Sequence, residues 1–133
     1  GVQLHDLRAA VVQWCGRYSQ QAWLRQLDMP GAGPAGITPA QEAAVLRTIA
    51  KLNGTPFPAT AALAGRWVKG RVRRAASVEQ TYCAEVVAAT YQAMGLIGPD
   101  RPTNYYDPGK FWSGNDLRLL EQATLGTEIP VHV

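Results

Sequence analysis

The chain has 133 residues, 47% of them hydrophobic and 17% charged, with a formal net charge of +3. This length suits one domain spanning residues 1–133, and no apolar run approaches the roughly 18 residues that cross a bilayer, which excludes a transmembrane protein. Five of the 13 basic residues fall within positions 66–74, so the excess charge is one local patch, and we do not expect a general nucleic-acid-binding protein.

The N-terminal part predicts two strands around a short helix. Apolar residues alternate over residues 1–7, which predicts a strand, and residues 9–14 form a candidate short helix. Bulky apolar residues over 21–27 predict a second strand. The Pro- and Gly-rich tract at 30–36 fits no regular structure and is expected to be a surface loop. The chain begins with Gly and has no signal-peptide pattern, so we expect a processed product or a piece of a longer protein.

The strongest helix signal lies at residues 38–52. Thr38 is a typical N-cap residue, Pro39 suits the first helical position, and Gln41 completes a capping box with Thr38. Gly54 is expected to end the helix in the left-handed conformation, together with the asparagine before it.

A second strong helix is predicted to follow Thr81. Its apolar positions recur at spacings of three and four residues, and Gly95 supplies the stop. This places Cys83 in the first turn, on the side facing the interior. A weaker helix is expected over residues 59–69, which carry Trp67 and end in the basic patch.

The C-terminal third is expected to be mostly irregular. Residues 99–114 are rich in Pro, Gly, Asn and aromatics and predict an ordered loop, and residues 116–120 predict a short helical or extended piece. Residues 128–133 alternate like a strand, which Pro130 would confine to a sheet edge. The overall pattern predicts a mixed α and β protein.

Cys83 is the first candidate for chemistry. Unpaired N–H groups and the positive end of the helix dipole favour the thiolate form of a cysteine in a first helical turn, and they also stabilise an oxyanion. The alternative is that Cys83 is a small hydrophobic core residue. Cys15 and Cys83 have no metal-type spacing, so neither a metal site nor a disulfide framework is expected, and no cofactor is implied.

The segment around Cys83 resembles a known family. Residues 81–95 are similar to the Y-C-S-E-L-V segment of the circularly permuted papain-like hydrolases, which include the bacterial YiiX/YaeF group and the NlpC-like and lecithin retinol acyltransferase-like relatives. Residues 1–7 look like the family's G-V-x-L-x-x-L strand, residues 22–27 like its following strand, and residues 106–112 like its late P-x-x-F turn. The resemblance runs along nearly the whole chain.

The resemblance implies a papain-like α+β fold, in which the Cys83 helix packs on an antiparallel sheet built from the strands at 1–7, at 21–27 and at the C-terminus. It also implies a thiol hydrolase or acyltransferase acting on an amide or ester, with Cys83 as nucleophile. Glu85 matches the family's acidic position and Tyr82 its aromatic position, whereas Ala84 stands where the family has serine. The implied substrates are peptide-like or lipid-like acyl groups.

The family's catalytic histidine has no counterpart in this chain. It lies N-terminal to the cysteine in the family, so the chain resembles the C-terminal part of the permuted domain without its histidine-bearing strands. The only histidines are His5, on the first predicted strand, and His132, on the last. Three explanations stay open: an upstream segment supplies the base, a partner or symmetry-related chain completes the site, or the chain has lost the chemistry. Gly1 favours the first.

Other residues have weaker signals. Asn104, Tyr106 and Trp112 lie in the aromatic-rich loop and are candidates for a substrate groove, although loop polar residues are more often turn formers. Cys15, Trp23 and Trp67 are interpreted as structural or core residues. Two other functions remain open: a non-catalytic binding or structural module, and a polyanion-binding protein that uses residues 66–74.

Overall fold

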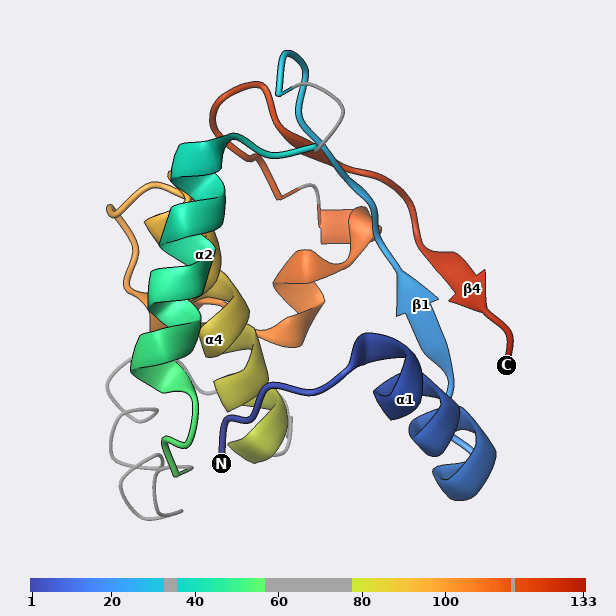
Figure 1. The fold of residues 1–133 in the computed structure, drawn as a ribbon. Coiled ribbons are helices and arrows are strands. Elements are labelled where there is room, and N and C mark those ends of the chain that lie inside the picture. Colours follow the sequence, from blue (N-terminus) through green and yellow to red (C-terminus); the bar gives the residue numbers. More distant parts are fainter. Residues whose placement is uncertain (33–35, 57–77, 116) are drawn as a thin grey trace.

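The computed structural model describes residues 1–32, 36–56, 78–115 and 117–133. In these residues the chain is a mixed α+β structure with two small antiparallel sheets, as predicted at this coarse level (Figure 1). The helices and strands are α1 (Leu7–Val12), a π-helical turn η1 (Gln13–Arg17), β1 (Ala22–Leu24), β2 (Leu27–Asp28), α2 (Pro39–Leu52), α4 (Val78–Ala93), β3 (Thr124–Leu125) and β4 (Ile129–Val131). The expected helix over 59–69 lies outside the described residues.

The predicted strand over residues 1–7 is wrong. Asp6 is the N-cap of α1 and its Oδ1 accepts a hydrogen bond from the Ala9 N–H at 2.8 Å, so the helix begins at Leu7. The residues before Asp6 run along the end of α2, where Val2 N donates to Thr55 O at 2.9 Å. The alternating apolar residues at 1–7 therefore do not form a strand, because Asp6 caps a helix and the residues before it contact the end of α2.

Two strand pairs replace the expected three-stranded sheet. β1 pairs antiparallel with β4, in a register that sets Trp23 opposite Pro130, and β2 pairs antiparallel with β3. The strand predicted over 21–27 is thus confirmed as two short strands, and the C-terminal strand with its proline is confirmed as β4. Strand β3 had no clear signal in the sequence.

Helix α2 forms as predicted. The Gln41 N–H donates to Thr38 Oγ1 at 3.2 Å and the Thr38 N–H donates to Gln41 Oε1 at 2.9 Å, which is a complete capping box. Gly54 follows the helix at φ +82°, the left-handed conformation expected of it.

Helix α4 begins earlier than predicted, at Val78, so Cys83 is its sixth residue and lies in the second turn. The prediction that Cys83 lies in the first turn is wrong, and so is the prediction that it faces the interior, because its side chain is exposed. The buried side of α4 carries Ala84 and Ala88 instead, whose small side chains allow close packing. Gly95, at φ +76°, ends the helix as expected.

The core lies between α4 and the segments that follow it. One buried cluster contains Met29, Met94, Leu96 and Ala123, and another contains Ala88, Ile97 and Tyr106, with Tyr91 packed against both. Helix α4 contacts α2 and the 3-10 turns η2 (Thr103–Tyr105) and η3 (Pro108–Phe111). The expected packing of the Cys83 helix directly on a sheet is therefore not the main contact of α4.

The segment after Gly95 is ordered but irregular, as predicted. It forms η2, η3 and η4 (Ser113–Asn115), while residues 117–120 form neither the helix nor the strand that was expected there. Within the described part of the chain, no helix combines the length and apolar character needed to cross a membrane.

Candidate active-site cleft

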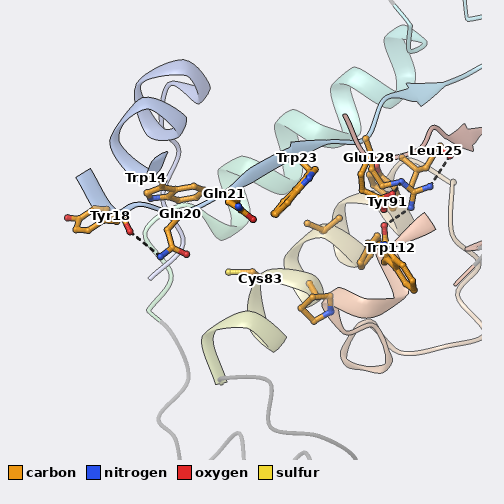
Figure 2. A pocket seen from close by; sticks show the side chains of 15 residues that line it. Trp14, Tyr18, Gln20, Gln21, Trp23, Cys83, Tyr91, Trp112, Leu125 and Glu128 are labelled. Atoms are coloured by element: carbon orange, nitrogen blue, oxygen red, sulfur yellow. Dashed lines mark hydrogen bonds and ion pairs between the residues drawn. The ribbon is translucent and has the colours of Figure 1, made fainter. Parts of the chain in front are cut away.

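An open cleft of about 1060 Å³ lies between α4 and the segment that joins α1 to β1 (Figure 2). Its walls come from sequence segments far apart: η1, β1, α4, η3 and the C-terminal strands. It is lined by Trp14, Tyr18, Gln20, Gln21, Trp23, Arg25, Cys83, Ala84, Val87, Tyr91, Pro108, Phe111, Trp112, Leu125 and Glu128.

Helix α4 brings the Cys83 thiol to one wall of this cleft. Cys83, Val87 and Tyr91 recur every four residues, so they lie on one face of the helix, and all three line the cleft. The neighbouring side of α4 faces α2, where Val86 and Thr90 line a small separate pocket. In Figure 2 the Cys83 sulfur points toward the side of the cleft that carries Gln20 and Gln21.

Exposed tryptophans form an aromatic wall along the cleft: Trp14 and Trp23 lie across it from Cys83, and Trp112 lies at its far end near Glu128 (Figure 2). The side chains of Trp14, Trp23 and Trp112 line the cleft and are 57%, 56% and 59% exposed. Trp14 belongs to the π-helical turn η1. Ser19, at φ 50°, lies in the turn between η1 and β1, the strand that carries Trp23. Large apolar side chains gathered on one open surface indicate a binding site.

The floor of the cleft is fixed by Arg25. Its guanidinium donates hydrogen bonds to the backbone carbonyls of Phe111, Leu125 and Gly126, and it lies 3.8 Å from Glu128. Because these carbonyls come from η3 and from the end of β3, Arg25 ties the end of β1 to both of the segments that complete the cleft.

Glu128 is held by a second set of contacts. The Ser113 N–H donates to Glu128 Oε1 at 2.8 Å, and the Ser113 hydroxyl donates to Oε2 at 2.6 Å. These hydrogen bonds, followed by the charge of Arg25, keep the pKa of Glu128 below its ordinary value of 4.5. Glu128 is therefore ionised at neutral pH and already paired, which makes it a poor proton acceptor for Cys83.

Tyr91 is the phenol on the α4 wall. Burial raises the pKa of Tyr91, and the charge of Arg25 opposes this shift only partly. The phenol therefore stays protonated at neutral pH and can donate a hydrogen bond into the cleft.

The structure brings together only two of the residues selected from the sequence. Cys83 and Trp112 both line the cleft. Tyr82 and Tyr106 are buried, and Glu85 accepts a hydrogen bond from the Thr103 hydroxyl at 3.2 Å, so these three side chains contribute to packing around α4.

The remaining candidates lie elsewhere. Asn104 is exposed in η2 and does not line the cleft. Neither histidine lines it: His5 Nε2 is 3.0 Å from Gln3 Oε1 on the N-terminal segment, and His132 lines a smaller pocket together with Cys15. The cleft thus holds a thiol without an imidazole from this chain.

Sequence reasoning missed most of the aromatic wall. Trp23 was interpreted as a core residue, but it is more than half exposed, and Trp14 was not selected. The available signal was composition, because Trp14 and Tyr18 flank a glycine and Trp23 follows within a few residues. Trp67 and the basic patch at 66–74 lie outside the described residues.

Among the residues that the structure describes, no group of three or more His, Cys, Asp and Glu side chains is placed to hold a metal ion. No protein-family model, no curated protein and no solved structure matches the chain.

Proposed function

We propose that the protein is a thiol hydrolase or acyltransferase acting on an amide or ester, in which Cys83 is the nucleophile and the base comes from outside this chain segment. The observation that carries the proposal is the position of Cys83: an exposed thiol on the wall of a large cleft, opposite an aromatic surface suited to an apolar ligand. The finer assignment to a permuted papain-like fold belongs to this proposal and is supported by the sequence resemblance.

The reaction has two steps. The Cys83 sulfur attacks the carbonyl carbon of the substrate, the C–O or C–N bond breaks, and the leaving alcohol or amine takes up a proton. The resulting thioester is then attacked by water, which gives a carboxylic acid, or by another nucleophile, which gives a transferred acyl group. The thiol is regenerated in either case.

Both steps need a base and an oxyanion donor. Because neither histidine lines the cleft, the base is assigned to another segment or chain that closes the open side next to Cys83. The N-terminus of α4 lies a full turn before Cys83, so the oxyanion donor is assigned to the cleft wall instead. Gln21 suits this role, because its side chain lines the cleft, whereas the Gln20 amide already donates to Tyr18 O at 3.2 Å.

An activated ester tests the nucleophile directly. With p-nitrophenyl acetate the leaving group needs no proton, so Cys83 should form a thioester that hydrolyses slowly and accumulates. Intact mass and peptide mapping should show one acetyl group on Cys83. Under the same conditions Gln21→Ala should slow acylation by roughly 10²-fold, and Gln20→Ala should change it little.

The two cysteines provide a matched control. Cys15→Ser leaves Cys83 as the only thiol and should retain the adduct, whereas Cys83→Ser leaves the half-buried Cys15 and should abolish it. Equal labelling of both cysteines, or labelling of Cys15 alone, would contradict the proposal. The result would then favour the second candidate function, a non-catalytic binding module, for which the exposed aromatic wall is the supporting observation.

A further inference from the structure

Strand β1 has one edge that β4 does not cover. Trp23 is paired with Pro130, and proline has no N–H, so these two residues cannot exchange a pair of backbone hydrogen bonds. The backbone hydrogen bonds between β1 and β4 must therefore be made by Ala22 and Leu24. In an antiparallel pair such positions alternate, so the N–H and C=O of Trp23 point away from β4.

Among the described residues, β1 pairs with β4 on one edge, and no backbone hydrogen bond outside the strand pairing involves Trp23. Figure 1 shows β4 along one side of β1, while the other side faces the space toward α4. An uncovered N–H and C=O on a strand edge are a template for another strand, and here that edge borders the Cys83 cleft.

The charges of the cleft are already neutralised. Arg25 donates to three backbone carbonyls and lies beside Glu128, and Glu128 accepts two hydrogen bonds from Ser113. Neither charge is available to select a charged ligand. The exposed indoles of Trp14, Trp23 and Trp112 lie along the cleft and suit uncharged apolar groups.

We propose that the cleft binds an extended peptide, which adds as a third strand to the free edge of β1 and places an apolar side chain against the indole of Trp23. A lipid chain could fill the apolar space, but it has no backbone N–H and C=O to pair with Trp23. This inference depends on the proposed function for one point only, that the bound peptide is a substrate of Cys83. The binding itself does not need the thiol.

Binding of blocked alanine hexapeptides with a central leucine, phenylalanine or tryptophan tests the proposal, measured by calorimetry on the Cys83→Ser variant. Each peptide is compared with two N-methylated forms, carrying the methyl group on one of two adjacent central residues. Because strand residues alternate in direction, one methyl group should weaken binding about tenfold and its neighbour less than twofold. Equal effects at both positions, or no binding by any of the peptides, would overturn the proposal.

The protein side offers a matched pair. Trp23→Ala removes the indole and keeps the backbone N–H, whereas Trp23→Pro removes both, and proline is tolerated at a strand edge where the N–H is unpaired. Both variants should bind more weakly than the parent, with Trp23→Pro the weaker of the two. Because proline keeps its backbone C=O, which accepts from the peptide N–H, both variants should remain sensitive to N-methylation of the peptide. Circular dichroism checks that Trp23→Pro is folded. If it is not, the N-methylated peptides still test the proposal, because they are measured on the Cys83→Ser variant with Trp23 in place.

The outcomes separate this inference from the proposed function. Peptide binding without an acetyl adduct on Cys83 would leave strand addition intact and contradict the hydrolase. An adduct on Cys83 with no peptide binding would leave the hydrolase and contradict strand addition. Co-sedimentation with phosphatidylcholine vesicles is the remaining arm: binding to vesicles in place of peptides would assign the aromatic wall to a lipid surface and overturn the proposal.

Discussion

At the scale of single residues, Arg25 and Glu128 decide the shape of the cleft. Arg25 extends from the end of β1 to carbonyls in η3 and near β3, and Glu128 fixes Ser113 beside Trp112. Their contacts link segments about 100 residues apart in sequence, as in the hydrogen bond from Arg25 to Leu125. The aromatic wall thus depends on one polar cluster.

This cluster makes stability depend on pH. The pKa of Glu128 is lower in the folded protein than its ordinary value of 4.5, so the unfolded chain binds more protons as the pH falls through that value. The stabilisation by ionised Glu128 is complete above about pH 4.5 and is lost progressively below it. The wild type should therefore exceed Glu128→Gln in its urea midpoint at pH 7, and the difference should narrow in acid.

The comparison between the two proteins removes the contribution of the other carboxylates. Glu121→Gln is the matched control, because Glu121 is exposed, and its difference from the wild type should stay nearly constant over the same pH range. A Glu128→Gln difference that is equally constant would show that the Ser113 and Arg25 contacts do not stabilise the ionised carboxylate.

At the scale of elements, helix α2 packs against α4 on a side next to the one that lines the cleft. Its capping box at Thr38 satisfies N–H groups at the helix start. Thr38→Ala should lower the free energy of unfolding by about 1 kcal/mol, measured by urea denaturation, whereas Thr38→Ser keeps the acceptor and should cost much less. Equal losses for the two variants would show that the cap oxygen is not what stabilises the helix.

The elements that the sequence predicts well are those whose signals are local. Helix α2 has its cap at Thr38 and its stop at Gly54, so its bounds follow from neighbouring residues. The strand predicted over 1–7 is wrong because the prediction rested on the alternation of apolar residues and did not consider that Asp6 can cap a helix. The predicted start of α4 after Thr81 is wrong by about one turn, because the spacing of apolar residues marks a face of a helix and not its first residue. Cys83 therefore lies in the second turn.

The cleft was less predictable, for a physical reason. Cys83 was selected from its local context, but its wall partners Trp14, Trp23 and Trp112 come from separate segments. Their convergence depends on tertiary contacts such as those of Arg25, which no local pattern encodes. Tyr106 illustrates the opposite error: it was assigned to a substrate groove from its loop, and it lies in the core.

At the scale of the whole molecule, the two walls of the cleft are joined by few contacts. Helix α1 and η1 lie beside β1, away from α2 and α4 (Figure 1), and none of the residues of α1 is buried. Cys83 is exposed on the cleft wall. An additional segment or chain that supplies the base can therefore reach the thiol without displacing the core, which lies behind α4.

The most direct measurement is the steady-state hydrolysis of p-nitrophenyl acetate as the concentration of added imidazole is raised, in the wild type and in Cys83→Ser. Imidazole should replace the missing base and speed hydrolysis of the Cys83 thioester. Turnover by the wild type should then rise with imidazole above the background that Cys83→Ser shows. Identical rates for the two proteins at every imidazole concentration would contradict the assignment of Cys83 as a nucleophile that awaits an external base.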